Sequence, residues 1–218
     1  MLLMSSTLSA QDNCGDKYRE QYLTGNVFYP YFLNYDGSPF YTDEWTTGSI
    51  KILSGDVYSD LKIRYDLNKD DIIYYNESIK KWILVDREII NEVWIKNPAT
   101  GQDFNLVHNY SIDTAANDKF FFVLIEGSVP LYMKKVKLID EYHSNYQAGC
   151  MLGKFYEKTR FYFVLNNKFY RVPLRKKKFL AYFPEQADML KKYINKNKYS
   201  LRSPDDLISV FKEINRIE

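Results

Sequence analysis

Two adjacent carboxylates beside a tryptophan are the residues of this chain whose types come nearest to a catalytic site. Asp43, Glu44 and Trp45 follow one another in an acidic, aromatic segment. Glycoside hydrolysis needs two acids about 5 to 9.5 Å apart across a sugar-binding cleft. Neighbouring side chains in an extended chain point to opposite faces, so adjacency does not establish such a pair. We favour a loop that caps a sheet edge, with these three residues as weak candidates for surface or ligand contacts.

The two histidines, His108 and His143, are the other residues suited to proton transfer or metal binding. His108 falls in phase with an alternating apolar face, which predicts a half-buried side chain with a structural role. His143 lies two residues after Glu141, on the same face if the segment is a strand. Two candidates do not make a metal shell. We expect His143 at the surface, as a weak candidate for ligand contact.

Sequence motifs for nucleophilic catalysis, metalloprotease chemistry or phosphate binding do not occur: GxSxG, HExxH, GxxxxGK[ST] and GxGxxG are all absent. We therefore predict no catalytic residue, no metal site and no cofactor. A non-enzymatic protein is the favoured hypothesis, and a hydrolase of unknown substrate is the minority one.

Basic residues gather in the C-terminal part of the chain. Between Cys150 and Lys198 there are 13 Lys and Arg against three acids, a net charge of +10 that leaves −8 for the remainder. This asymmetry suits an anionic lipid or polymer. One basic run could contact lipid headgroups or lipopolysaccharide phosphates, although a solvated helix face is the structural alternative. These weak candidates are Arg175, Lys176, Lys177 and Lys178.

A basic, aromatic hairpin precedes this run. Residues 160–164 and 168–171 interleave bases with aromatic side chains, as single-stranded nucleic-acid platforms do. The glycines of an RRM motif are absent, and the same alternation describes a strand with Phe161, Phe163 and Leu165 buried. We do not expect a nucleic-acid partner. The partners that we expect are envelope lipid, lipopolysaccharide or another envelope protein.

Strand-like alternation dominates the chain and predicts a mainly β fold. Residues 61–67 alternate apolar and polar side chains with the period of a half-buried strand. The predicted strands cover residues 49–53, 61–67, 72–76, 82–85, 92–96, 104–112, 120–125, 131–140, 155–165 and 168–172. The clearest reversals are predicted at Ser54–Asp56, Asn68–Asp70 and Asn166–Asn167. A large antiparallel meander of this kind tends to curl, so we expect a half-barrel, barrel or sandwich.

The pattern changes to helix after Pro173. Apolar residues at spacings of three and four predict helices over residues 174–183 and 185–196. Ser203 as N-cap and Pro204 in the first turn begin the last helix. We expect two to three C-terminal helices, within residues 174–216, packed on the sheet.

The N-terminal residues 1–10 resemble the tail of a secretory signal peptide, because they are short and apolar and end in small residues. A positively charged n-region is absent. We expect export to the periplasm or cell envelope and a single β-rich domain over residues 11–218. Cys14 and Cys150 could pair in an oxidising compartment, but their polar, loop-like surroundings favour two separate thiols.

Several motifs together resemble an uncharacterised family of exported, β-rich proteins of Bacteroidota. The likeness covers most of residues 25–216. It is carried by the turn Gly37-Ser38-Pro39-Phe40, the segment Asp43-Glu44-Trp45, the strand Leu61-Lys62-Ile63-Arg64-Tyr65-Asp66 and the Lys-rich helices at Phe179–Tyr199 and Pro204–Asn215. These motifs carry no known chemistry, so the resemblance implies export and fold rather than an activity.

The functional expectation is an exported envelope protein that acts without catalysis, as a binding or structural module. A carrier of lipid or another apolar ligand in a β half-barrel is the alternative, motivated by 20 Tyr and 14 Phe. The longest apolar run, residues 120–125, is far shorter than the roughly 20 residues of a membrane-spanning helix.

Overall fold

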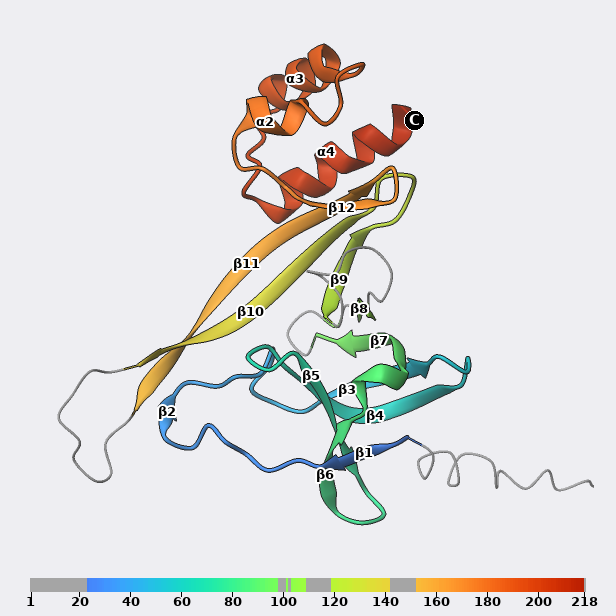
Figure 1. Ribbon diagram of the computed structural model, residues 1–218, viewed down its shortest axis with the longest axis vertical. Coiled ribbons are helices and arrows are strands. Elements are labelled where there is room, and N and C mark those ends of the chain that lie inside the picture. Colours follow the sequence, from blue (N-terminus) through green and yellow to red (C-terminus); the bar gives the residue numbers. More distant parts are fainter. Residues whose placement is uncertain (1–22, 98–100, 102, 109–118, 142–151, 218) are drawn as a thin grey trace, which may run out of the picture.

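Alternating strands pair in long hairpins and build one large, curled sheet, which three C-terminal helices cover at one end (Figure 1). The computed structural model describes residues 23–97, 101, 103–108, 119–141 and 152–217. Within them the strands are β1 (Gly25–Val27), β2 (Tyr35–Asp36), β3 (Thr46–Ile52), β4 (Val57–Asp66), β5 (Asp71–Asn76), β6 (Lys81–Val85), β7 (Ile90–Lys96), β8 (Asp103–His108), β9 (Phe120–Ile125), β10 (Leu131–Glu141), β11 (Gly153–Leu165) and β12 (Lys168–Arg171). The predicted mainly β class is confirmed.

The strand order is β1-β6-β5-β4-β3-β7-β8-β9-β10-β11-β12, and every neighbouring pair along it is antiparallel. The short β2 lies off this path and pairs with β11 in parallel, so the sheet is mixed. Because β1 and β12 stand at opposite ends and do not pair, the sheet is open. A closed barrel, one of the predicted alternatives, is therefore wrong, while the curled meander is confirmed.

The predicted turns lie where the strands reverse. Asn166 and Asn167 have φ values of 50° and 58°, as the two-residue hairpin between β11 and β12 requires. Gly55 (φ 97°) and Asp70 (φ 64°) take left-handed conformations in the two earlier reversals. Strand lengths were predicted less well: β4 begins at Val57, four residues before the predicted start, because pairing with β3 extends it. The second half of the predicted strand 104–112 lies outside the described residues.

The helices α2 (Lys176–Leu180), α3 (Ala187–Lys196) and α4 (Pro204–Ile217) follow the sheet. α4 turns Leu207, Val210, Phe211 and Ile214 inward, and the Phe211 ring lies 5.6 Å from that of Phe163 on β11. Sheet and helices thus share one hydrophobic core. Over the described residues, none of the helices has the length and hydrophobicity needed to span a bilayer.

The turn between β4 and β5 crosses the curl and docks on β10, which lies five strands further along the sheet order. The backbone N–H of Lys137 on β10 donates to the carbonyl of Leu67 over 3.0 Å. The amide of Asn68 donates to the carbonyl of Lys137 over 2.8 Å. These two hydrogen bonds fix the distance between the β4–β5 turn and β10, although these two strands do not pair with β10.

A buried ion pair completes this docking contact. The Lys134 side chain on β10 is 6% exposed, and its ammonium contacts the Asp70 carboxylate. The same ammonium donates to the Tyr65 hydroxyl (3.0 Å) and to the carbonyl of Phe120 (2.8 Å). All three ammonium protons therefore have acceptors, which is the condition under which a buried charge is tolerated.

We expect Asp70→Asn to lower the free energy of unfolding by about 3–5 kcal/mol, because it leaves the Lys134 ammonium buried without its anion. Asn is well suited to the left-handed backbone at this position, so the turn itself is preserved. Urea unfolding measures the change. The double variant Asp70→Asn, Lys134→Met removes the stranded charge and should recover most of the loss. A single variant within 0.5 kcal/mol of wild type, roughly the effect of a surface substitution, would contradict this account.

Candidate anion-binding site

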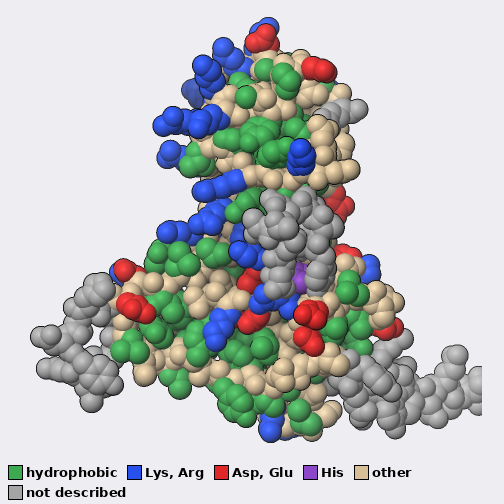
Figure 2. All heavy atoms as spheres, in the orientation of Figure 1, with side chains coloured by type: hydrophobic (Ala, Val, Ile, Leu, Met, Phe, Trp, Pro, Cys, Tyr) green, Lys and Arg blue, Asp and Glu red, His purple; other side chains and the backbone are tan. Residues whose placement is uncertain are grey.

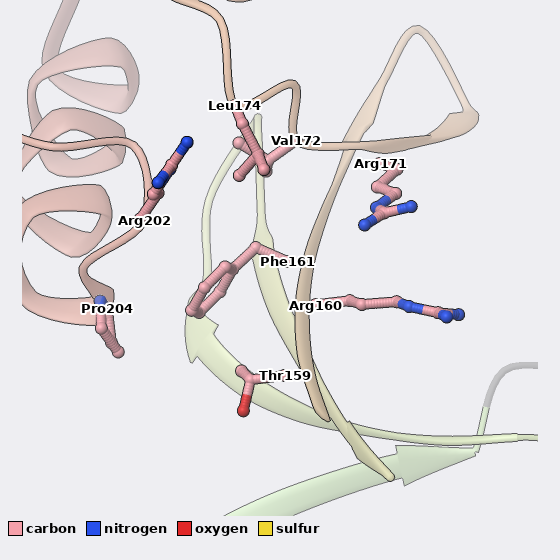
Figure 3. A pocket seen from close by; sticks show the side chains of 8 residues that line it. All are labelled: Thr159, Arg160, Phe161, Arg171, Val172, Leu174, Arg202 and Pro204. Carbon is pink, nitrogen blue, oxygen red and sulfur yellow. The ribbon is translucent and has the colours of Figure 1, made fainter. Parts of the chain in front are cut away.

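An arginine-lined cleft forms where β12 leaves the sheet. The N–H of Val172 donates to the carbonyl of Phe161 over 2.8 Å, and Pro173 then follows without an N–H to continue the ladder. The chain turns away from β11 towards α2 and opens a cleft of about 390 Å³ (Figure 3). It is lined by Thr159, Arg160, Phe161, Arg171, Val172, Leu174, Arg202 and Pro204. We call it the arginine cleft.

The three arginines come from three separate segments. Arg171 lies opposite Tyr162 in the hairpin, so it shares a face with Arg160, and Figure 3 shows both side chains on the side of the hairpin away from Phe161 and Arg202. Arg202 comes from the turn before α4, which the buried Leu201 anchors in the core. Packing of the hairpin and of α4 therefore places residues that are far apart in the sequence around one cleft, with Arg202 on the other side of the hairpin from the Arg160 and Arg171 side chains.

Apolar side chains make the floor of the cleft. Phe161 and Val172 are buried, whereas Leu174 is 53% exposed beside them. The cleft thus combines guanidinium groups with an apolar surface at its mouth.

Among the described residues that line the cleft there is no Asp or Glu, so they bring no negative charge to its walls. Within the part of the chain that the structure describes, the guanidinium groups of Arg160, Arg171 and Arg202 have no ion pair or hydrogen bond. Guanidinium groups offer paired donors to phosphate and carboxylate oxygens, so these exposed side chains can bind such groups, Arg160 and Arg171 on one face of the hairpin and Arg202 on the other side.

The predicted basic run continues the cleft. A neighbouring cavity of about 380 Å³ shares Arg171, Val172 and Leu174 with it and reaches Arg175 and Lys178. Figure 2 shows Lys and Arg side chains gathered along this flank of the molecule.

The other two residues of that run lie on α2. Lys177 is exposed, whereas Lys176 donates to the side-chain oxygen of Asn195 on α3 over 2.6 Å. Lys176 is therefore engaged within the helices, and the remaining members of the run face solvent.

The acidic segment predicted as a weak site lies on another part of the molecule. Asp43 and Glu44 are exposed, and neither lines the arginine cleft. The ring of Trp45 packs edge-on against Trp82 at 5.1 Å, with the guanidinium of Arg64 4.8 Å from its centre. Trp45 thus closes an aromatic cluster on the sheet. His143, the remaining weak candidate, lies outside the described residues.

His108 is buried and stacks on the ring of Phe120 at 4.7 Å, which agrees with the predicted structural role. Over the described ranges, no group of three or more His, Cys, Asp and Glu side chains is arranged to hold a metal ion.

The Lys134 ammonium is the one strongly perturbed cation of the docking contact. Burial lowers its pKa to about 8, although the Asp70 carboxylate opposes the shift. Burial and the same carboxylate raise the pKa of Tyr65 well above its usual range. A lysine of this kind can serve as a base, but Lys134 is enclosed by its acceptors and lines neither the arginine cleft nor its neighbour. We assign it to the docking contact.

The sequence analysis identified some residues of the arginine cleft but missed Arg202. The interleaved hairpin drew attention to Arg160 and Arg171, and the basic run contains Arg175. Arg202 was missed because it stands alone in the turn before α4. No local pattern links it to the hairpin, since the link is the packing of α4.

Comparison of the chain with protein-family models, with curated proteins and with solved structures gives no match in any of the three.

Lys134 should make the stability of the protein rise with pH above about 8. Its pKa is about 8 in the folded protein and has the ordinary value of 10.5 in the unfolded chain. Between these values the unfolded chain binds more protons, so the free energy of unfolding rises by up to about 1.4 kcal/mol per pH unit. Below pH 8 the group is protonated in both states and contributes no slope.

The measurement is urea unfolding of wild type and of Lys134→Met at pH 7, 8, 9 and 10, because other titrating groups are common to both proteins. The difference in unfolding free energy should move in favour of wild type above pH 8. Parallel pH curves would show that Lys134 keeps an ordinary pKa.

Proposed function

We propose that this protein is an exported envelope protein without catalytic activity, whose arginine cleft binds the phosphate-bearing headgroup of an anionic lipid or lipopolysaccharide. The observation that carries the proposal is that Arg160, Arg171 and Arg202 all line one cleft, with no acid among the described residues that line it. Other cations of the described chain do have partners, as Lys51 has in Glu92 and Arg87 in Asp71. The cleft arginines have none among the described residues.

The surroundings of the cleft suit an amphiphile rather than a small free anion. Leu174 exposes apolar surface between Arg171 and the basic run, and Arg175 and Lys178 line the neighbouring cavity beside it. Basic residues at a lipid surface contribute about 1 kcal/mol each, and an inserted apolar side chain adds to this. A membrane containing anionic lipid presents both kinds of partner at once.

The alternatives receive less support. The carboxylates Asp43 and Glu44 lie in the open and apart from the cleft, so they offer no concave site for a hydrolase. An apolar ligand inside the curl would have to displace packed side chains such as Tyr65, Phe120 and Phe122, all of which are buried.

Export and location in the periplasm or envelope are part of this proposal. They rest on the signal-like residues 1–10 and on the family resemblance. Fractionation of cells that produce the full chain tests them: the protein should leave with the periplasmic or envelope fraction.

Neutralising two cleft arginines should weaken binding to anionic membranes. For Arg171→Gln, Arg202→Gln we expect about a 10- to 30-fold loss of affinity for phosphatidylcholine vesicles that contain phosphatidylglycerol, from about 1 kcal/mol per lost charge. Vesicle co-sedimentation measures it, and binding of wild type should fall with added salt.

The matched control is Lys62→Gln, Lys80→Gln, which changes the net charge equally. These lysines pair with Glu77 on a distant hairpin, so the control should bind as wild type does. Equal losses in both variants would mean that net charge alone drives binding. Wild-type binding to vesicles without phosphatidylglycerol at the same strength would also contradict the proposal.

A further inference from the structure

The outer edge of β11 is open along its middle. β12 pairs with residues 162–165 of this edge, and β2 pairs with residues 153–154 at the other end. No strand of the described chain pairs with residues 155–160 on that side. Figure 1 shows the long β10–β11 hairpin running out from the helices with this edge exposed.

The backbone groups that point to the open edge follow from the register. Leu165 and Lys168 flank the two-residue turn, so Leu165, Phe163 and Phe161 direct their N–H and C=O groups towards β12. The pairing of β10 with β11 runs without a bulge. By the same alternation, Glu157 and Thr159 direct their N–H and C=O groups outward, where an added strand would bond to them.

The outer edge of β10, on the opposite side of the same hairpin, has its backbone groups bonded to another segment of the chain. On β10 the outward N–H of Lys137 donates to Leu67, and its carbonyl accepts from Asn68. The docked turn therefore covers the β10 edge, whereas nothing among the described residues does the same for β11.

Side chains beside the open edge set the chemistry of a strand that could add there. On one face stand Tyr156, Lys158 and Arg160, all exposed. On the other face lie Phe155, Thr159 and the buried Phe161. Glu157, the only acid of residues 155–160, is paired with Lys135 over 2.8 Å. An incoming strand would meet cations on one face and mainly apolar or neutral groups on the other.

We infer that the β11 edge binds an extended acidic segment of another polypeptide by strand addition, with acidic and apolar side chains alternating along that segment. Strand addition takes its affinity from main-chain hydrogen bonds and its specificity from alternate side chains. A second copy of the same edge is disfavoured, because antiparallel pairing centred on Thr159 would set Lys158 of one chain against Arg160 of the other, and cations of this kind guard natural sheet edges against self-pairing. This surface shares Thr159 and Arg160 with the lining of the arginine cleft, but the inference does not depend on the lipid-binding proposal.

The test uses a fluorescent peptide in which glutamate alternates with valine and threonine, with binding measured by anisotropy on the full chain. The same peptide N-methylated at alternate residues loses its donors to β11 and should bind at least about tenfold more weakly. Thr159→Pro removes an outward N–H from β11 and should cause a similar loss, whereas Thr159→Val keeps that N–H and should bind as wild type. Circular dichroism of both variants checks that each remains folded.

Three outcomes would overturn the inference. Equal binding of the N-methylated peptide would show that charge alone holds it. Unchanged peptide binding by a folded Thr159→Pro variant would place the peptide elsewhere. A wild-type dimer that Thr159→Pro dissociates would show that a second copy occupies the edge. The variant Arg171→Gln, Arg202→Gln should lose vesicle binding and keep peptide binding, because neither residue belongs to the open edge 155–160, and this separates the inference from the proposed function.

Discussion

The docking of the β4–β5 turn on β10 is the contact on which the shape of the molecule depends. Strands β4 and β10 are five places apart in the sheet order, so pairing between neighbours leaves their distance free. The Lys134–Asp70 ion pair and the backbone bond from Lys137 to Leu67 fix that distance. A buried ion pair adds little net stability over an apolar contact of the same shape, but it penalises every arrangement that separates the charges. The docking contact therefore selects this curl of the sheet over arrangements in which β4 and β10 lie further apart.

Fixing the curl has consequences at the far end of the hairpin. Because the turn covers one edge of β10, β10 and β11 can extend together beyond the rest of the sheet. The helices then pack on the inner face of the same hairpin through contacts such as Phe163 with Phe211. Their packing brings Arg202 to the place where β12 has already left β11. The cleft therefore lies where the pairing of β12 with β11 ends and where the helices pack against the hairpin.

Local structure could be predicted because its causes are local. Alternation over residues 61–67 and the pair Asn166–Asn167 act through neighbouring backbone and side chains, and both features appear in the structure. The open sheet could not be chosen over a barrel, because closure depends on whether β1 and β12 meet. The ion pair could not be seen either, since Asp70 and Lys134 are 64 positions apart and each resembles an ordinary surface residue. Arg202 escaped notice for the same reason.

Basic side chains in the first part of the chain often have partners within the protein, whereas those of the arginine cleft have none among the described residues. The uneven distribution of charge along the chain reflects this difference. Before residue 150, several basic side chains form contacts within the protein. Lys134 and Arg87 pair with acids, and Lys137 donates to the carbonyls of Ser38 and Phe40. After residue 150, acids are too few to neutralise the bases, and the cleft arginines remain without partners among the described residues. Arg160 and Arg171 share one face of the β11–β12 hairpin, where cations without a neighbouring acid repel one another. A carboxylate near them would relieve this repulsion, and under the proposed function an anionic ligand would supply that negative charge.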